Sequence, residues 1–169
     1  NTGGMGAYSP APVLPESDYQ KASEASIVPV IRHMARSGHP YTGILYAGLM
    51  FTDDGPQVLE YNVRFGDPEC QPLLMRLDCD LAEVMLACVE GRLDKVELGV
   101  KPETSVCVVM AAQGYPGSYP KGMDIRGIAE AEKLDQVKVF HAGTKAEGGK
   151  VYSTGGRVLG VTALGADLA

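Results

Sequence analysis

Apolar residues recur at helical spacing early in the chain, between Ser17, a typical N-cap residue, and Gly38, a typical stop signal. These apolar positions are Ile27, Val30, Ile31 and Met34. The spacing predicts a helix from about 17 to 37, which Pro29 should kink or split because it lacks a backbone N–H. Residues 1–15, rich in Gly and Pro, are expected to form a loop.

A β-hairpin is predicted next. Residues 41–51 and 57–64 are rich in β-forming residues, and the turn sequence Asp53-Asp54-Gly55-Pro56 separates them. Two helices should follow. The first is expected to begin at Asp67-Pro68-Glu69, with Asp67 as N-cap and Pro68 at the first helical position, and the second should run from Asp80 to Glu90.

Strand-like runs dominate after about residue 100. They cover residues 105–112, 137–141, 150–153 and 157–163. A helix–hairpin–helix region followed by several strands predicts an α+β protein with two parts, residues 1–100 and a smaller, mostly β region over 101–169.

Composition narrows the function classes. The chain has 169 residues, a formal net charge of −6 and 45% hydrophobic residues. These values exclude wholesale disorder and argue against a nucleic-acid groove built on bulk positive charge. The 21 glycines are more than usual for this length and need a local explanation.

The cysteines and the two ends of the sequence suggest a context for the chain. Four cysteines, with no CxxC pair and no zinc-finger spacing to His, are expected to be free thiols in the core of a cytoplasmic protein. The sequence begins at Asn1 without an initiator Met, and it stops at Ala169, just after a candidate helix N-cap, Asp167. We therefore expect an internal segment of a longer polypeptide.

The stretch Glu60-x-Asn62-x-Arg64 carries the most informative chemistry. Alternate residues of a strand share one face, which puts these three side chains in a row with Leu59, Tyr61 and Val63 pointing into a core. Glu and Asn oxygens suit Mg²⁺, and the planar Arg fork suits a phosphoryl group, so the row could hold a metal–triphosphate complex. The alternative is the ordinary solvated face of an antiparallel sheet.

Glycine-rich turns are the second candidates. Gly3, Gly4 and Gly6 would allow a close backbone approach to an anion, although a plain linker explains them equally. Asp67 already has a structural explanation as a helix-start residue. The Gly-bearing turns at 141–144 and 154–157 are expected at strand ends; the first contains His141, the one histidine of interest.

Taken together, these motifs resemble the glycinamide ribonucleotide synthetases (phosphoribosylamine–glycine ligases) of the ATP-grasp superfamily. The resemblance covers nearly the whole chain, and its most specific strings are Asn-Thr-Gly-Gly-Met-Gly at 1–6 and Arg-Phe-Gly-Asp-Pro-Glu at 64–69. Further matching strings occur at 41–48, 109–112, 114–117, 141–144 and 155–159. The implied fold is the carboxyl-side half of an ATP-grasp domain followed by a small, truncated carboxyl-terminal domain.

The resemblance implies an activity and a set of site residues. The enzyme would use ATP and Mg²⁺ or Mn²⁺ to ligate glycine to 5-phosphoribosylamine through glycyl phosphate, in de novo purine biosynthesis. By the family pattern Glu60 and Asn62 are the metal ligands and Arg64 clamps the transferred phosphate, while the Gly3–Gly6 loop and Asp67 lie beside the substrates.

The resemblance also implies what is missing. The adenine pocket and a phosphate-binding Lys belong to a preceding part of the family's polypeptide, so the segment alone is expected to be inactive and not to bind ATP usefully. Leu45-Tyr46-Ala47 stands where many ATP-grasp enzymes carry a further metal-binding Glu. Two alternatives stay open: an ATP-grasp ligase with another acceptor, and a non-catalytic binding module. Neither a membrane nor a nucleic-acid partner is expected.

Overall fold

The chain passes back and forth between two structural units. The computed structural model describes residues 3–168. Unit 1 is built from the segment up to Pro10, from Asp67–Leu77 and from the chain after Val100; unit 2 is built from Ala11–Gly66 and Asp78–Gly99. The helices and antiparallel strands of both units confirm the α+β class.

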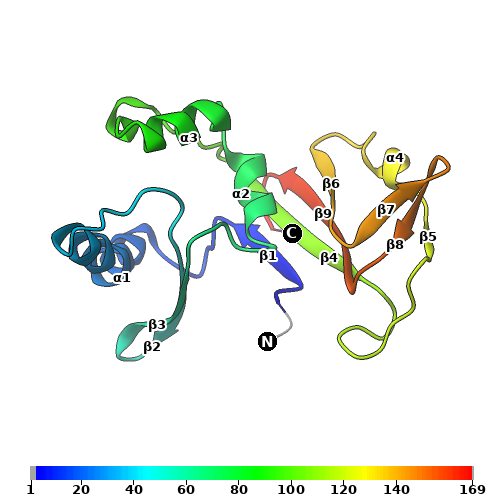
Figure 1. The fold of residues 1–169 in the computed structure, drawn as a ribbon, viewed down its shortest axis with the longest axis horizontal. Coiled ribbons are helices and arrows are strands. Elements are labelled where there is room, and N and C mark those ends of the chain that lie inside the picture. The colour runs from blue at the N-terminus through cyan, green and yellow to red at the C-terminus, as the bar shows by residue number, and fades with distance from the viewer. Residues whose placement is uncertain (1–2, 169) are drawn as a thin grey trace. The chain divides into compact units, whose positions relative to one another are not determined.

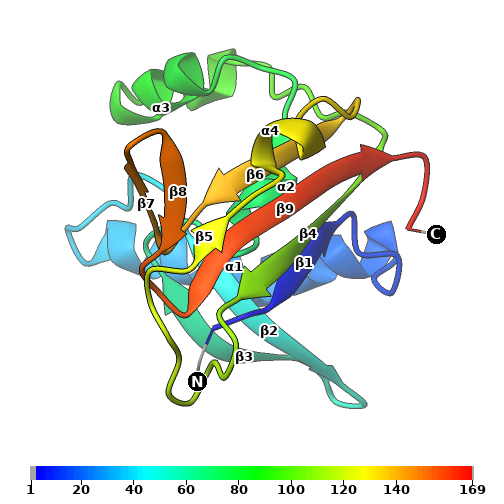
Figure 2. The same ribbon diagram turned by 90° about the vertical axis from the view of Figure 1, so that its right-hand side faces the viewer.

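Unit 1 is organised around a four-stranded antiparallel sheet of order β1-β4-β9-β6 (Figure 1). Its strands are β1 (Gly6–Ser9), β4 (Thr104–Ala111), β9 (Arg157–Gly165) and β6 (Val137–His141). Helix α2 (Cys70–Arg76) packs across β1, β4 and β9. Figure 2 shows α2 behind this sheet and α4 (Ile128–Ala131) in front of it.

A second, three-stranded antiparallel sheet completes unit 1. Its order is β5-β8-β7, with β5 at Asp124–Ile125, β8 at Lys150–Ser153 and β7 at Thr144–Glu147. Ile125 and Ile128 pack against a buried cluster formed by Val139, Val158 and Leu159. Elements from both sheets therefore enclose one side of the unit 1 core.

The expectation of a loop over the first fifteen residues is wrong at β1. Gly6 lies opposite Val108 and Ser9 opposite Ser105, so the start of the chain pairs with a strand about one hundred residues later. The sequence patterns also did not predict the short strands β5 and β7. Strand β5 pairs with β8, whereas β7 pairs with β8 across the short turn at Gly148-Gly149, and both strands are too short for their residue pattern to predict them.

Strand β9 is buried on both faces. Gly160 faces Gln71 of α2, where a Cβ atom would lie 3.7 Å from the Gln71 amide nitrogen, whereas Leu159 belongs to the cluster on the opposite face. A one-residue bulge places Val158 without an opposite residue, because Met110 pairs with Leu159 and Ala111 pairs with Arg157. The bulge turns Arg157 out of the simple alternation along the strand.

Unit 2 contains the predicted long helix and hairpin. Helix α1 (Glu16–Arg36) packs on β3 (Gly55–Asn62), which pairs with β2 (Tyr46–Thr52). Helix α3 (Leu81–Val89) and the short 3-10 helix η1 (Leu93–Lys95) contact each other. The hairpin prediction and both helix predictions in this unit are confirmed.

A tyrosine connects the hairpin to α1 near the helix proline. The Tyr61 hydroxyl donates to the Ser26 carbonyl oxygen at 2.8 Å, and the buried Ser26 hydroxyl donates to the Ala22 carbonyl at 2.6 Å. Helix α1 is continuous through Pro29, so the expected split does not occur. Packing on β3 therefore outweighs the lost backbone hydrogen bond.

The two shorter helices begin differently. The Asp80 carboxylate accepts from the N–H groups of Ala82 and Glu83 at 2.9 and 3.2 Å, which confirms it as the N-cap of α3. The expected start of α2 at Asp67 is wrong: Asp67 and Pro68 lie in a turn, and the helix begins at Cys70. The Asp67 carboxylate is engaged elsewhere, as described below.

The cysteine and membrane expectations have simple outcomes. All four cysteines are free thiols; Cys107 is buried, and Cys70, Cys79 and Cys88 are half-buried. Among residues 3–168, we find no helix with both the length and the apolar character needed to cross a membrane.

Two of the glycine-rich turns pack against each other. The Gly143 carbonyl accepts from the Thr154 and Gly155 N–H groups at 2.7 and 3.2 Å. A Cβ atom on Gly143 would lie 2.6 Å from the Gly155 Cα atom, and one on Gly156 would lie 2.2 Å from the Tyr115 ring. These glycines permit a backbone crossing inside unit 1, which explains part of the glycine excess.

We therefore expect Gly143→Ala to lower the free energy of unfolding by about 1–3 kcal/mol, because the added methyl group overpacks a backbone crossing. The matched control is Gly165→Ala at the end of β9, where a Cβ atom would meet only an ordinary contact at 3.5 Å. Urea unfolding monitored by circular dichroism measures both variants. Equal midpoints for the two variants would contradict the crossing as a packing constraint.

Candidate active site

Two of the predicted site residues meet at the end of β3. The Asn62 side-chain amide donates to a Glu60 carboxylate oxygen at 3.1 Å, as expected for residues on one face of a strand. Glu60 is exposed, and Asn62, the last residue of the strand, is partly exposed. The pair therefore places a carboxylate and a carboxamide side by side, and both groups carry oxygen atoms of the kind that suits Mg²⁺.

A β-bulge and a glycine shape the position of Glu60. Gly48 lies opposite Glu60 and Leu49 opposite Val58, so Leu59 has no opposite residue. A Cβ atom on Gly48 would come within 3.2 Å of the Glu60 Cγ atom. Glycine at position 48 therefore leaves the space that the Glu60 side chain occupies.

The predicted row is correct for two of its three members. Strand β3 ends at Asn62, and Arg64 lies in the bend that follows. The expectation that the alternate residues point into a core is wrong for Leu59 and Val63, which are 65% and 77% exposed. The bulge removes Leu59 from the alternation, and the strand ends before Val63.

Arg64 is oriented by its own chain. One guanidinium nitrogen donates to the Phe65 carbonyl oxygen at 2.8 Å. The residue is exposed, in keeping with a side chain that can approach a phosphoryl group from solvent. Its predicted role as a phosphate clamp stays a prediction.

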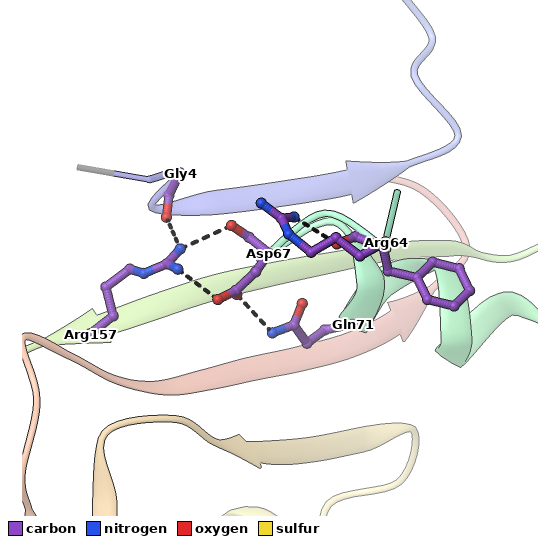
Figure 3. A network of polar contacts seen from close by, with 6 residues as sticks. Gly4, Arg64, Asp67, Gln71 and Arg157 are labelled. Atoms are coloured by element: carbon purple, nitrogen blue, oxygen red, sulfur yellow. Dashed lines mark hydrogen bonds and ion pairs between the residues drawn. The ribbon is translucent and has the colours of Figure 1, made fainter. Parts of the chain in front are cut away.

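In unit 1, Asp67 is held by Arg157 (Figure 3). The Arg157 guanidinium donates to the Asp67 carboxylate at 2.6 Å and to the Asp67 main-chain carbonyl at 3.0 Å. It also donates to the Gly4 carbonyl at 3.0 Å. The other Asp67 carboxylate oxygen accepts from the Gln71 amide at 3.3 Å. This network, here called the Arg157 clamp, consists of Gly4, Asp67, Gln71 and Arg157.

The three glycines of the opening segment contact protein atoms on the side where a Cβ atom would stand. A Cβ atom on Gly3, which has φ +80°, would lie 3.1 Å from the Arg157 guanidinium. A Cβ atom on Gly4 would lie 2.9 Å from Pro68, and one on Gly6 would lie 3.0 Å from the Cys107 carbonyl oxygen. Close packing within unit 1 accounts for glycine at these positions. Their predicted place beside the substrates stays a prediction.

The remaining candidate, His141, has a local role. Its Nδ1 atom lies 2.9 Å from the Thr144 hydroxyl, across the turn between β6 and β7. Sequence reasoning missed a role for Arg157, which was noticed only as part of the Gly-bearing turn at 154–157 and of a matching string. The only sign of such a role was a long charged side chain directly after Gly155-Gly156, and nothing in the local sequence predicts that it binds Gly4 and Asp67.

Comparisons with known proteins bear on this arrangement. The ATP-grasp (A) domain of phosphoribosylglycinamide synthetase matches residues 1–70, and the C domain of the same synthetase matches residues 105–169. The chain belongs to the phosphoribosylglycinamide synthetase family. The Glu60–Asn62 pair falls within the A-domain match, and Arg157 falls within the C-domain match.

Individual members of the synthetase family align over the whole chain. This chain is 60% identical over 166 residues to the phosphoribosylamine–glycine ligase of Rhodopirellula baltica, and the match covers 98% of this chain and 38% of that protein. The corresponding ligase of Brucella melitensis is 52% identical over 169 residues, covering 100% of this chain and 40% of that protein. The chain thus spans about two fifths of the length of these relatives.

A solved structure supports the family fold. The crystal structure of phosphoribosylamine–glycine ligase from Thermotoga maritima has a TM-score of 0.81 and 34% sequence identity to this chain. The match covers 99% of this chain and 40% of that one. The fold described above is therefore that of part of a synthetase of this family.

Two thiols near the Arg157 clamp stay protonated at neutral pH. Burial, reinforced by the negative charge of Asp67, raises the pKa of Cys70 above its ordinary value. Burial is also the largest cause of the raised pKa of Cys107. A nucleophilic cysteine needs a lowered pKa, so these residues do not resemble catalytic thiols.

Metal-binding donors are sparse in the described part of the chain. Residues 3–168 contain no group of three or more His, Cys, Asp or Glu side chains that could hold a metal ion. A Mg²⁺ ion bound with nucleotide phosphates needs only one or two protein carboxylates or amides. The metal-binding role of Glu60 and Asn62 therefore stays a prediction.

Proposed function

We propose that the protein containing this chain is an ATP-dependent ligase that joins glycine to 5-phosphoribosylamine, forming glycinamide ribonucleotide, ADP and phosphate. The relatives that match nearly all of this chain carry the name phosphoribosylamine–glycine ligase. The structural observation that supports the proposal is the contact between Asn62 and Glu60, which places a carboxamide beside a carboxylate at the end of one strand.

The proposed reaction has two steps. A carboxylate oxygen of glycine attacks the γ-phosphorus of ATP, the bond to the β–γ bridging oxygen breaks, and glycyl phosphate and ADP result. The amine of phosphoribosylamine then attacks the glycyl carbonyl, loses a proton and expels phosphate. The first step is a phosphoryl transfer, in which positioning and charge stabilisation supply most of the catalysis.

Glu60 and Asn62 would hold Mg²⁺ or Mn²⁺ in this enzyme. Bound there, the ion would neutralise charge on the nucleotide phosphates. Asn62 can turn its amide oxygen, rather than the nitrogen that now donates to Glu60, toward a cation. Gly48 would keep the carboxylate in place by leaving its methylene chain room beside the opposite strand.

Arg64 and Asp67 would have separate roles in the reaction. The Arg64 guanidinium would bind the transferred phosphoryl oxygens in a bidentate fashion, and its exposure permits this. The Asp67 carboxylate and the Gly3–Gly6 segment would face the other substrates. A carboxylate accepts from an amine or a hydroxyl and repels phosphates, so Asp67 suits the amino group of glycine or the amine and ribose hydroxyls of phosphoribosylamine, away from its 5-phosphate.

The first test is ADP release by the complete protein. With ATP and Mg²⁺ present, we expect ADP formation over many turnovers to require both glycine and phosphoribosylamine and not to be supported by other acceptor amines. Activity with a different acceptor would favour another ATP-grasp ligase. The absence of any ATP-dependent ligation would favour a non-catalytic module.

The second test is Glu60→Gln in the complete protein, which removes a charge from the proposed metal site at nearly constant shape. We expect turnover to fall by about 10³-fold or more, since charge stabilisation at the phosphates is lost. The matched control is Asp54→Asn at the turn of the same hairpin, which should stay within about 2-fold of wild type. Near-normal ADP release from Glu60→Gln would contradict the metal assignment.

A further inference from the structure

Arg157 has no role in the reaction outlined above, although it contacts two segments proposed to lie beside the substrates. We propose that Arg157 is a positioning residue: it fixes Asp67 and the Gly3–Gly4 backbone in the geometry that receives glycine or phosphoribosylamine. This inference rests on the proposed ligase function. Its basis is the Arg157 clamp within unit 1.

The contacts of the Arg157 guanidinium identify its function as structural support for a site rather than ligand binding. One terminal nitrogen donates to both the Gly4 and the Asp67 main-chain carbonyls, each at 3.0 Å, and the other donates to the Asp67 carboxylate at 2.6 Å. The side chain is only 21% exposed, whereas that of Asp67 is 54% exposed. Arg157 therefore faces protein, and Asp67 keeps an open side toward solvent.

The Gly3–Gly4 backbone depends on this support because it lies beyond the sheet. Pairing of β1 with β4 begins at Gly6, and the Met5 carbonyl accepts from the Val109 N–H at 3.0 Å. The next carbonyl outward, that of Gly4, accepts from Arg157 instead. Arg157 thus binds the backbone of the opening segment before the first residue of β1, where the hydrogen bonds of the sheet no longer reach it.

The same guanidinium also constrains Asp67. Two hydrogen bonds from Arg157 fix both the backbone and the carboxylate of Asp67, and Gln71 fixes the second carboxylate oxygen at 3.3 Å. A change at Arg157 should therefore displace the Asp67 carboxylate.

Only a guanidinium can make this set of contacts. Its planar fork supplies two terminal nitrogens in fixed geometry, whereas a Lys ammonium is a single point donor on a flexible stem. Arg157→Lys should keep one ion pair with Asp67 and lose part of the hold on Gly4. The clamp therefore predicts a graded response, with Lys intermediate between Arg and Met.

The experiment compares steady-state kinetics of the complete ligase carrying Arg157→Met or Arg157→Lys. The matched control is Arg126→Met, another arginine of unit 1, which pairs with Asp124 at 2.8 Å and is 84% exposed. Circular dichroism and urea unfolding establish the folded fraction of each variant. ATP, glycine and phosphoribosylamine are varied in turn.

For Arg157→Met we expect the KM for glycine or for phosphoribosylamine to rise about 10-fold, with the KM for ATP within about 2-fold of wild type. Arg157→Lys should give a smaller rise, and Arg126→Met none. If Arg157 only stabilises the fold, the apparent kcat of Arg157→Met should fall in proportion to the folded fraction, and every KM should stay unchanged. That result would overturn the proposal. A wild-type enzyme that releases no ADP with these substrates would instead contradict the proposed ligase itself, and this role with it.

Discussion

The Arg157 clamp of unit 1 depends on the ion pair between Arg157 and Asp67. This one guanidinium joins the opening glycine segment, the turn before α2 and the start of β9, which lie far apart in the sequence. At the surface an isolated ion pair contributes little, but a multidentate guanidinium with low exposure contributes more. The Arg157 clamp therefore gives a physical reason why the A-domain and C-domain matches of the synthetase family meet in unit 1.

Local patterns were sufficient for elements that local chemistry specifies. The Asp80 cap, the turn at residues 53–56 and the contact of Glu60 with Asn62 all follow from short-range rules of capping, turn formation and alternation. Strand β1 could not be predicted in this way, because its partner is about one hundred residues away. Asp67 appeared to be a helix cap, and only the folded chain shows that Arg157 occupies its carboxylate.

Alternation misplaced Leu59 because of a β-bulge, and a second bulge lies in β9. Leu59 in β3 and Val158 in β9 each lack an opposite residue, and each precedes or follows a proposed functional side chain, Glu60 or Arg157. A bulge redirects side chains without a mark in the hydrophobic pattern. The turns that contain Gly143 and Gly156 lie at strand ends, as expected, but that these glycines pack against other parts of unit 1 has no mark in the local sequence.

The most direct test of the clamp is a double-mutant cycle in the complete ligase, with Asp67→Asn, Arg157→Met and the combined variant compared by kcat/KM for phosphoribosylamine. If Arg157 acts through Asp67, the double variant should be no slower than the slower single variant, within about 2-fold, which corresponds to a coupling of about 1 kcal/mol or more. If the effects of the two single changes simply multiply, Arg157 and Asp67 act independently, and the clamp does not position Asp67.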